Sequence, residues 1–209
     1  MRRGALCLCV RGHLWLIRSL KRIGVYGGTF DPIHYAHLIL ARDALEALQL
    51  ERIIFVPAAT SPHKLEQTPA PAAARLEMLE AALMDDAASA IDELELHRPP
   101  PSFTVDTIEE FLRRDPQLEI HYLVGSDNLT RLRTWHRFEE LRELVKFVLL
   151  NRGAGLGSGS EFPVIKRHIG ISATEIRNRV ATGRSIRYLV PPAVEEIIHR
   201  HQLYKERTE

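Results

Sequence analysis

From residue 23 onward, short apolar segments of strand length alternate with segments whose apolar residues recur at helical spacing. This alternation is typical of a parallel sheet covered by helices, because each parallel strand reaches the next through a crossover connection. Strands are expected at 23–26, 52–56, 91–96, 119–124 and 146–150, and helices at 37–48, 72–83, 105–113 and 138–144. The sequence therefore predicts an α/β fold built on a parallel sheet.

The chain divides into an extension, one domain and a short tail. Residues 1–22 hold an apolar run that Arg11 and His13 interrupt too early for a membrane span, and we interpret them as an extension that is poorly ordered or comes from a start assigned too early. Residues 23–204 are expected to form the domain, in which the glycine-rich loop 153–160 separates the sheet from a small helical part beginning near 171. Helices are expected there at 172–181 and 194–201, and residues 205–209 form the tail.

The charge balance narrows the classes of partner. Lys plus Arg number 28 and Asp plus Glu number 27, so a net charge of +1 gives no electrostatic reason to expect binding of nucleic acid or an anionic membrane. The two cysteines, Cys7 and Cys9, offer no disulfide framework, which favours a cytoplasmic location. Any anion site must then be a local arrangement of residues.

The segment GGTFDPIHYAH, residues 27–37, follows the first expected strand and leads into the first expected helix. Gly27 and Gly28 allow a sharp turn and a close approach to a ligand, and the helix directs its unpaired N–H groups toward the same place. His34 and His37 are three residues apart, so both imidazoles are expected to face this turn and to donate to phosphate oxygens. A buried structural histidine or half of a zinc site are the alternatives.

This segment resembles the T/H-x-G-H signature of the nucleotidyltransferase superfamily, with Ala36 where that family usually has Gly. The resemblance implies a Rossmann-like, doubly wound parallel sheet with a small helical C-terminal part, and transfer of a nucleotidyl group from a nucleoside triphosphate. It also implies that His34 and His37 contact the triphosphate. The residues that carry it are Gly28, Thr29, Phe30, Pro32, His34 and His37.

A second motif, ISATEIR at residues 171–177, opens a helix near the other end of the chain. Ser172 followed by Glu175 fits a capping box, while Thr174 and Arg177 share a helix face on which they can hold an anion. The segment is similar to the I-S-S-T-x-x-R motif that nucleotide adenylyltransferases use on the ATP phosphates, with Ala173 in place of the second Ser. The cap and the anion site are compatible interpretations.

Three segments between these motifs narrow the choice of substrate. In TSPHK, His63 and Lys64 follow the second strand and can bind another phosphate, or else belong to a solvated loop. In SFTVDTIEEF, Thr104 is expected to cap the following helix, and most of that segment is structural. After the fourth strand, Asp127 can accept from ribose hydroxyls, and Trp135 can stack on a heteroaromatic ring or pack in the core.

Together these segments resemble the bacterial nicotinate-mononucleotide adenylyltransferases, over about residues 23–204. The resemblance implies the formation of nicotinate adenine dinucleotide and pyrophosphate from nicotinate mononucleotide and ATP in NAD biosynthesis, with Mg²⁺ brought by ATP and no dedicated metal cage. It implies catalytic roles for His34, His37 and Arg177. The implied ATP-binding residues are Gly27, Gly28, Thr29, Phe30, His34, His37, Gly125, Asp127, Ser172, Thr174 and Arg177, and the implied mononucleotide-binding residues are His63, Lys64, Phe103, Thr104 and Trp135.

Two alternatives stay open at this point. Nicotinamide mononucleotide or phosphopantetheine could be the acceptor, because backbone N–H groups can distinguish acid from amide without a trace in the side chains. A nucleotide-binding regulatory module that has lost turnover is the alternative outside enzymes. The presence of His34, His37, Lys64, Thr174 and Arg177 together argues against it. The sequence indicates no oligomeric state.

Overall fold

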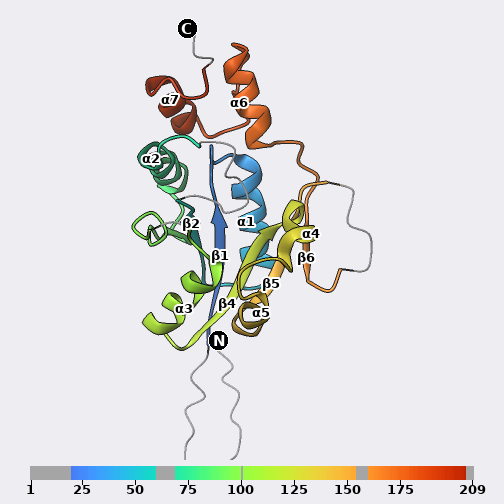
Figure 1. The fold of residues 1–209 in the computed structure, drawn as a ribbon. Helices are drawn as coiled ribbons and strands as arrows, with labels where there is room; N and C mark the ends of the chain where they lie inside the picture. Colours follow the sequence, from blue (N-terminus) through green and yellow to red (C-terminus); the bar gives the residue numbers. More distant parts are fainter. Residues whose placement is uncertain (1–19, 60–68, 100, 154–159, 206–209) are drawn as a thin grey trace, which may run out of the picture.

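The computed structural model describes residues 20–59, 69–99, 101–153 and 160–205. Most of the predicted extension, residues 1–19, lies outside them, as do residues 154–159 of the predicted loop and 206–209 of the tail. The described chain forms a six-stranded, all-parallel sheet in the order β3-β2-β1-β4-β5-β6 (Figure 1). The strands are β1 (Lys21–Gly28), β2 (Arg52–Pro57), β3 (Ser89–Ile91), β4 (Leu118–Gly125), β5 (Lys146–Asn151) and β6 (Val164–Lys166).

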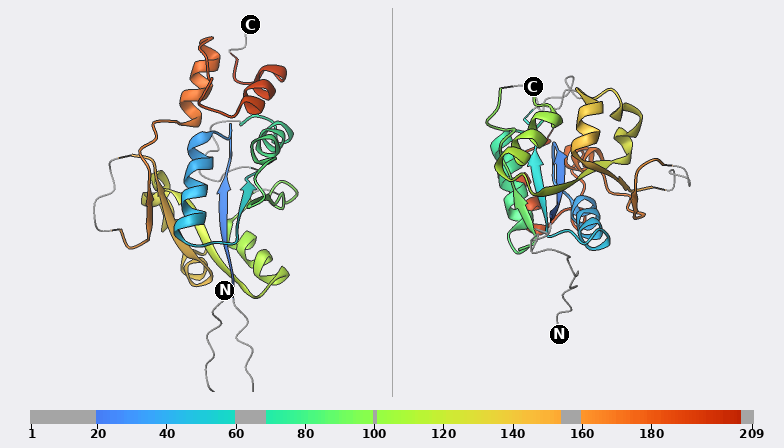
Figure 2. Two further views of the ribbon diagram at one scale, coloured as in Figure 1. Left: turned by 180° about the vertical axis from the view of Figure 1, so that it is seen from behind. Right: turned by 90° about the horizontal axis from the view of Figure 1, so that it is seen from below.

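Helices cover both faces of the sheet, so the predicted doubly wound, Rossmann-like α/β fold is confirmed (Figure 2). Helices α1 (Tyr35–Ala47) and α2 (Ala72–Leu83) pack on one face, and α3 (Thr104–Arg114) and α5 (Phe138–Leu144) on the other. The short η1 (Ser126–Asn128) and α4 (Leu129–Leu132) follow β4 directly.

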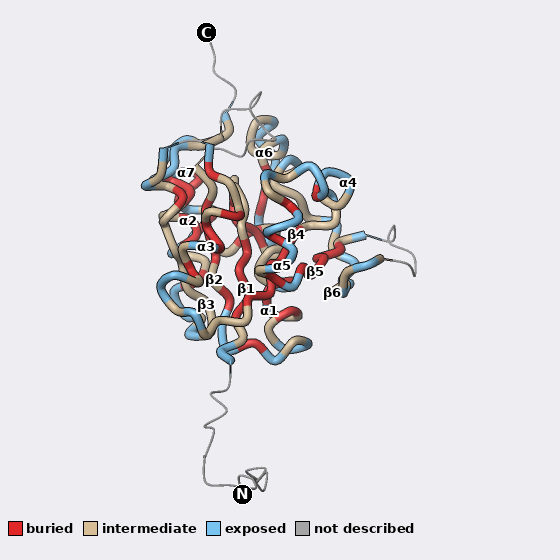
Figure 3. Tube along the Cα trace, turned by 60° about the horizontal axis from the view of Figure 1, so that its bottom comes forward, coloured by how far each residue is buried: buried red, intermediate tan, exposed pale blue. Residues whose placement is uncertain are grey.

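Two apolar clusters result from the strand alternation, one on each face. Along β1, Val25 belongs to the cluster under α3 and α5, whereas Tyr26 belongs to the cluster under α1 and α2. Successive strand side chains point to opposite faces, and a parallel sheet buried on both faces therefore has apolar residues at nearly every central position. The buried trace in Figure 3 follows these central strands.

The predicted third strand at 91–96 is wrong for residues 92–96, since β3 ends at Ile91. The Asp92 carboxylate accepts from the Leu94 N–H at 3.0 Å and closes a turn there. An Asp side chain that bonds to the backbone two residues ahead offers the chain an alternative to the sheet ladder. Strand β6 was not predicted, and β1 begins two residues before the predicted strand, at Lys21.

The carboxy-terminal part consists of α6 (Ala173–Ala181) and α7 (Pro192–Arg200), which lie beyond the ends toward which the strands point (Figure 1). The Ser172 hydroxyl accepts from the Glu175 N–H at 3.1 Å, which confirms the predicted cap. Helix α7 packs on α2, where Glu77 forms ion pairs with Arg200 and His201. Within the described ranges, no helix is long and apolar enough to cross a membrane.

Candidate active site at the carboxyl end of the sheet

The strand order places a reversal point between β1 and β4. From β1 the chain proceeds to β2 on one side, and from β4 it proceeds to β5 on the other. In open α/β sheets, ligands bind in the crevice at the carboxyl ends of strands where the order reverses. Gly27 and Gly28 end β1, while Gly125 ends β4 and Asp127 follows in η1, so these four predicted residues meet at this point.

The turn after β1 is held by a cluster of aromatic rings. Phe30 adopts a left-handed backbone conformation, with φ of 48°, and is buried. Its ring packs at 5.3 Å from the His37 ring and at 5.5 Å from the Tyr26 ring. A left-handed non-glycine residue costs free energy and persists only when its surroundings fix it. The rings therefore fix the shape of the turn.

The two predicted histidines lie in contact at the start of α1. His34 is the N-cap residue and His37 lies in the first turn, and their rings stack at 3.7 Å with an interplanar angle of 16°. His34 is completely buried, and both of its ring nitrogens lack a hydrogen-bond partner elsewhere in the described chain. A buried donor without a partner is costly, and a phosphate oxygen that reached it would relieve that cost.

The surroundings of His34 decide whether its imidazole carries a positive charge. Burial, together with the nearby Arg152 guanidinium, lowers the pKa of the His34 imidazole to about 3. A histidine with such a pKa is neutral near pH 7, so in the free protein it can donate one N–H but supplies no positive charge.

Positive charge at this site comes from arginines. Arg177 on α6 donates to the Asp31 carbonyl at 2.8 Å and to the Thr174 hydroxyl at 3.3 Å, which brings α6 beside the turn after β1. Thr174 itself is exposed. Among the described residues, no carboxylate lies within ion-pair distance of Arg177. Its charge is available to an anion.

Arg152 is a second cation that the sequence analysis missed. It follows β5 directly and donates to the Ile171 carbonyl at 3.3 Å, next to the start of α6. Its charge acts on both His34 and the Tyr26 hydroxyl, which places it near the histidine pair. The signal available in the sequence was its position, because residues just beyond the carboxyl ends of parallel strands face the ligand crevice.

At the end of β4, Asp127 is exposed and its carboxylate lies against Gly125. A side chain at Gly125 would overlap that carboxylate, so it would displace the Asp127 side chain from this position. The neighbouring Ser126 hydroxyl donates to the Asn151 amide oxygen at 3.3 Å, which ties the ends of β4 and β5 together.

The predicted ring-binding residues meet around Tyr122. The Tyr122 ring lies edge-on to Trp135 at 5.9 Å, and its hydroxyl lies 3.5 Å from the Thr104 hydroxyl. The same hydroxyl contacts Gly27, whose missing side chain leaves room for it. Phe103 stacks at 4.2 Å on His136, the residue after Trp135. The buried Tyr122 therefore links two parts of the site. One is the ring side, formed by Thr104 and Trp135, and the other is the phosphate side, formed by the turn that begins at Gly27.

The expected cap at Thr104 is wrong. Phe103 is the N-cap residue of α3 and has no side-chain bond to the helix, and Thr104 is already the first helical residue. His63 and Lys64 lie outside the described residues.

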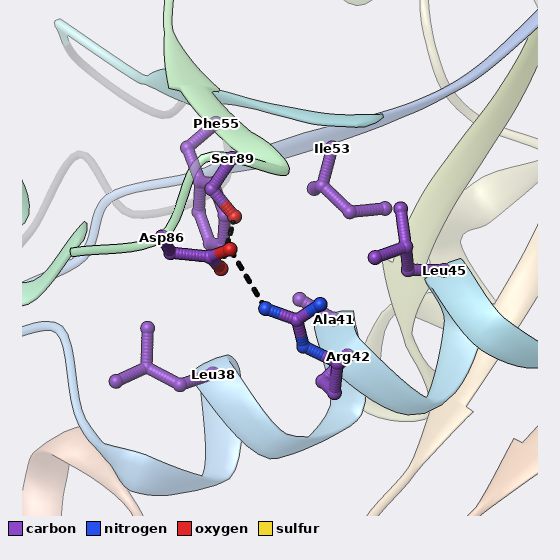
Figure 4. Close-up of a pocket in the computed structure, with 8 residues that line it drawn as sticks. All are labelled: Leu38, Ala41, Arg42, Leu45, Ile53, Phe55, Asp86 and Ser89. Carbon is purple, nitrogen blue, oxygen red and sulfur yellow. Dashed lines mark hydrogen bonds and ion pairs between the residues drawn. The ribbon is translucent and has the colours of Figure 1, made fainter. Parts of the chain in front are cut away.

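The pocket in Figure 4 is a different place on the molecule. It is lined by α1, β2, the start of β3 and the segment before it, and the Arg42–Asp86 ion pair of 2.7 Å spans it. No predicted site residue contributes to its lining, so it is not the candidate active site.

Comparison with known proteins gives a consistent result. The cytidylyltransferase-like family model matches residues 25–179. "Probable nicotinate-nucleotide adenylyltransferase" of Thermus thermophilus is 44% identical over 187 residues, which cover 88% of this chain and 100% of that protein. The protein of the same name from Geobacillus thermodenitrificans is 42% identical, over 90% of this chain and 88% of that one.

The fold is also that of a solved structure, Plasmodium falciparum nicotinic acid mononucleotide adenylyltransferase complexed with NaAD. The TM-score is 0.75, at 21% identity, and the match covers 88% of this chain and 97% of that one.

Proposed function

The chain belongs to the cytidylyltransferase-like family and, within it, to the nicotinate-nucleotide adenylyltransferases, and we propose from its site how it makes nicotinate adenine dinucleotide from nicotinate mononucleotide and ATP. The observation that carries the proposal is that His34 and His37 stack where the turn after β1 enters α1, while Arg177 bonds to the Asp31 carbonyl in the same turn, at the reversal point of the sheet. Two histidine donors and an unpaired cation at such a place suit a polyphosphate.

The reaction is a direct displacement at phosphorus. An oxygen of the mononucleotide phosphate forms a bond to the α-phosphorus of ATP, while the bond from that phosphorus to the bridging oxygen breaks and its electron pair leaves with pyrophosphate. Such transfers depend on positioning and on stabilising charge rather than on a protein nucleophile. We assign His34 and His37 to the triphosphate as donors, and Arg177 with Thr174 to the departing pyrophosphate.

The remaining assignments follow the position of each residue. The nucleotide ribose is faced by Gly125 and Asp127. The backbone around the triphosphate is formed by Gly27, Gly28, Thr29, Phe30 and Ser172. Phe103, Thr104 and Trp135 surround the pyridine ring, supported by Tyr122. His63 and Lys64 are assigned to the mononucleotide phosphate on the sequence alone.

Magnesium is treated as part of the ATP substrate. Within the described residues no group of three or more His, Cys, Asp or Glu side chains could hold a metal ion. Mg²⁺ commonly keeps several waters and binds through substrate phosphates, so we propose that it enters the site as MgATP.

The test is pyrophosphate release from MgATP with nicotinate mononucleotide, nicotinamide mononucleotide and phosphopantetheine offered separately. We expect strong preference for the nicotinate substrate and a loss of about 10²-fold in kcat for His37→Ala. His199→Ala, which removes an exposed histidine of α7 that lies within ion-pair distance of Glu195 on the same helix, is the matched control and should retain full activity.

Each result has a clear meaning. Turnover with another acceptor alone would overturn the substrate assignment and keep the reaction type. Binding of ATP without release from any acceptor would favour the regulatory module. Equal activity of His37→Ala and the unaltered protein would overturn the assigned site.

A further inference from the structure

Arg75 is a buried cation that the mechanism above does not use. It lies in the first turn of α2, where the neighbouring buried positions hold Ala74, Met78 and Leu79, and it is 1% exposed. Charged side chains are rarely so buried, and a buried charge is tolerated only when it is well hydrogen-bonded. Its surroundings must therefore supply partners.

Those partners are backbone carbonyls from three separate segments. The Arg75 Nη1 donates to the Thr29 carbonyl at 2.7 Å and to the Ala58 carbonyl at 2.9 Å. Its Nε donates to the Ala70 carbonyl at 3.0 Å, and Nη2 lies 3.5 Å from the Ala59 carbonyl. The planar guanidinium fixes the directions of its donors, so one side chain holds all three segments in a single geometry.

Two of the three segments lead to the two halves of the proposed site. Thr29 lies in the turn after β1, which we assign to ATP, while Ala58 and Ala59 continue from β2 into the stretch that carries His63 and Lys64. The Ala70 N–H donates in turn to the Asp31 carboxylate at 3.3 Å. The Ala58 N–H donates to the Gly28 carbonyl at 2.9 Å, so the turn after β1 and the end of β2 are also in direct contact.

We propose that Arg75 is a positioning residue that fixes the turn after β1 relative to the end of β2, and thereby the distance between the two substrates. This inference rests on the proposed function. A reaction between two bound substrates depends steeply on their relative placement, and a displacement of about 1 Å can lower the rate about 10²-fold. Binding of either substrate alone depends much less on that distance.

The experiment compares Arg75→Met with Leu83→Ala, which truncates a buried side chain two turns further along α2. For Arg75→Met we expect kcat to fall about 10- to 10²-fold, while the Kd for ATP measured without the second substrate changes less than about threefold. Leu83→Ala should lower Tm but keep kcat and KM within about twofold, because it creates a cavity away from the site.

A second readout needs no turnover. Hydrogen exchange at the Ala58 and Ala70 amides should accelerate in Arg75→Met and stay unchanged in Leu83→Ala, because their acceptors Gly28 and Asp31 lie in the turn that Arg75 holds. Arg75→Lys keeps the positive charge but lacks the planar guanidinium with its fixed donors. Its kcat and its exchange rates should lie between those of Arg75→Met and those of Leu83→Ala. This variant decides the question if Arg75→Met does not fold.

Unchanged kcat and unchanged exchange in Arg75→Met, or in Arg75→Lys where the former does not fold, would overturn the inference. So would a loss of activity that follows Tm equally in the Arg75 and Leu83 variants. Failure of the unaltered protein to release pyrophosphate would instead overturn the proposed function, and the exchange measurement would still report whether Arg75 holds the two segments together.

Discussion

Two pairs of basic residues, one at each end of the sheet, differ in their partners. At the amino end, Arg22 and Lys146 both pair with the Glu119 carboxylate, at 3.1 and 2.9 Å. At the carboxyl end, Arg152 and Arg177 donate to backbone carbonyls, and the described residues place no carboxylate within ion-pair distance of either. A cation that is paired with a carboxylate attracts an anionic ligand only weakly. An unpaired cation attracts such a ligand with its full charge. The two unpaired arginines lie at the end of the sheet where the glycine turn and the histidine pair predict the anion site.

The largest effect is expected at Arg177. Arg177→Met should lower kcat/KM about 10²- to 10³-fold, because it removes a charge that stabilises the departing pyrophosphate. Arg179→Met is the matched control on the same helix, since Arg179 already pairs with Glu175 at 3.0 Å. Steady-state kinetics of both variants would contradict the comparison if the two lost activity equally.

Strand β5 offers the sharpest internal test, since it carries a cation at each end. Arg152→Met should lower kcat/KM about 10- to 10²-fold, because a charge near the histidine pair is lost. Lys146→Met at the amino end should leave activity unchanged and cost less than about 1 kcal/mol of unfolding free energy, as exposed ion pairs usually do. A larger loss of activity from Lys146→Met than from Arg152→Met would break the contrast between the two ends.

The comparison between paired and unpaired charged groups also applies to an acidic residue, Glu95. It is buried, accepts from the Thr107 hydroxyl at 2.8 Å, and has no ion-pair partner within the described chain. Burial raises the pKa of its carboxyl from 4.5 to about 7. The folded protein therefore binds the proton more tightly than the unfolded chain, and stability falls as pH rises from about 4.5 to about 7.

Glu95→Gln should remove that pH dependence. The variant should match the unaltered protein below about pH 4.5 and exceed it by about 3 kcal/mol above pH 7, measured by denaturant unfolding across the range. An advantage that grew toward low pH would have the wrong sign and would exclude a neutral Glu95 in the folded state.

The smallest effect is expected from Gly27→Ala. The added methyl would overlap the Tyr122 hydroxyl, which links the phosphate side to the ring side, and kcat/KM should fall about tenfold as Tyr122 moves. Gly170→Ala, where no atom lies within 4 Å of the added methyl, is the control. Equal kinetics of the two variants would show that the Tyr122 contact has no part in positioning.

The sequence predicted those features that depend on residues close to one another along the chain. Helices α2 and α5 match the predicted ranges, because apolar periodicity decides them, and the Ser172 cap is confirmed because its partner is three residues away. The third strand was wrong because apolar alternation at 91–96 competed with the turn that Asp92 closes. The periodicity of apolar residues does not show that the Asp92 side chain bonds to the backbone in place of a neighbouring strand.

The features that escaped prediction depend on contacts between distant residues. Arg75 is a lone cation in the apolar stripe of α2, which is a signal, but its partners lie in three segments that only the fold brings together. The role of Tyr122 likewise depends on the room left by Gly27, about a hundred residues earlier. The spacing of His34 and His37 predicted their proximity, yet only their burial revealed that His34 is neutral.

The contacts of Asp31 also set an order of assembly during synthesis. Its carbonyl accepts from Arg177 and its carboxylate accepts from the Tyr204 hydroxyl, across 146 and 173 residues of chain. A ribosome makes the turn that holds Asp31 early and the two partners last, and a sheet can form before such long-range contacts close. A nascent chain that ends before Arg177 should therefore bind ATP weakly even with all six strands made, so that catalytic competence coincides with the emergence of the final helices.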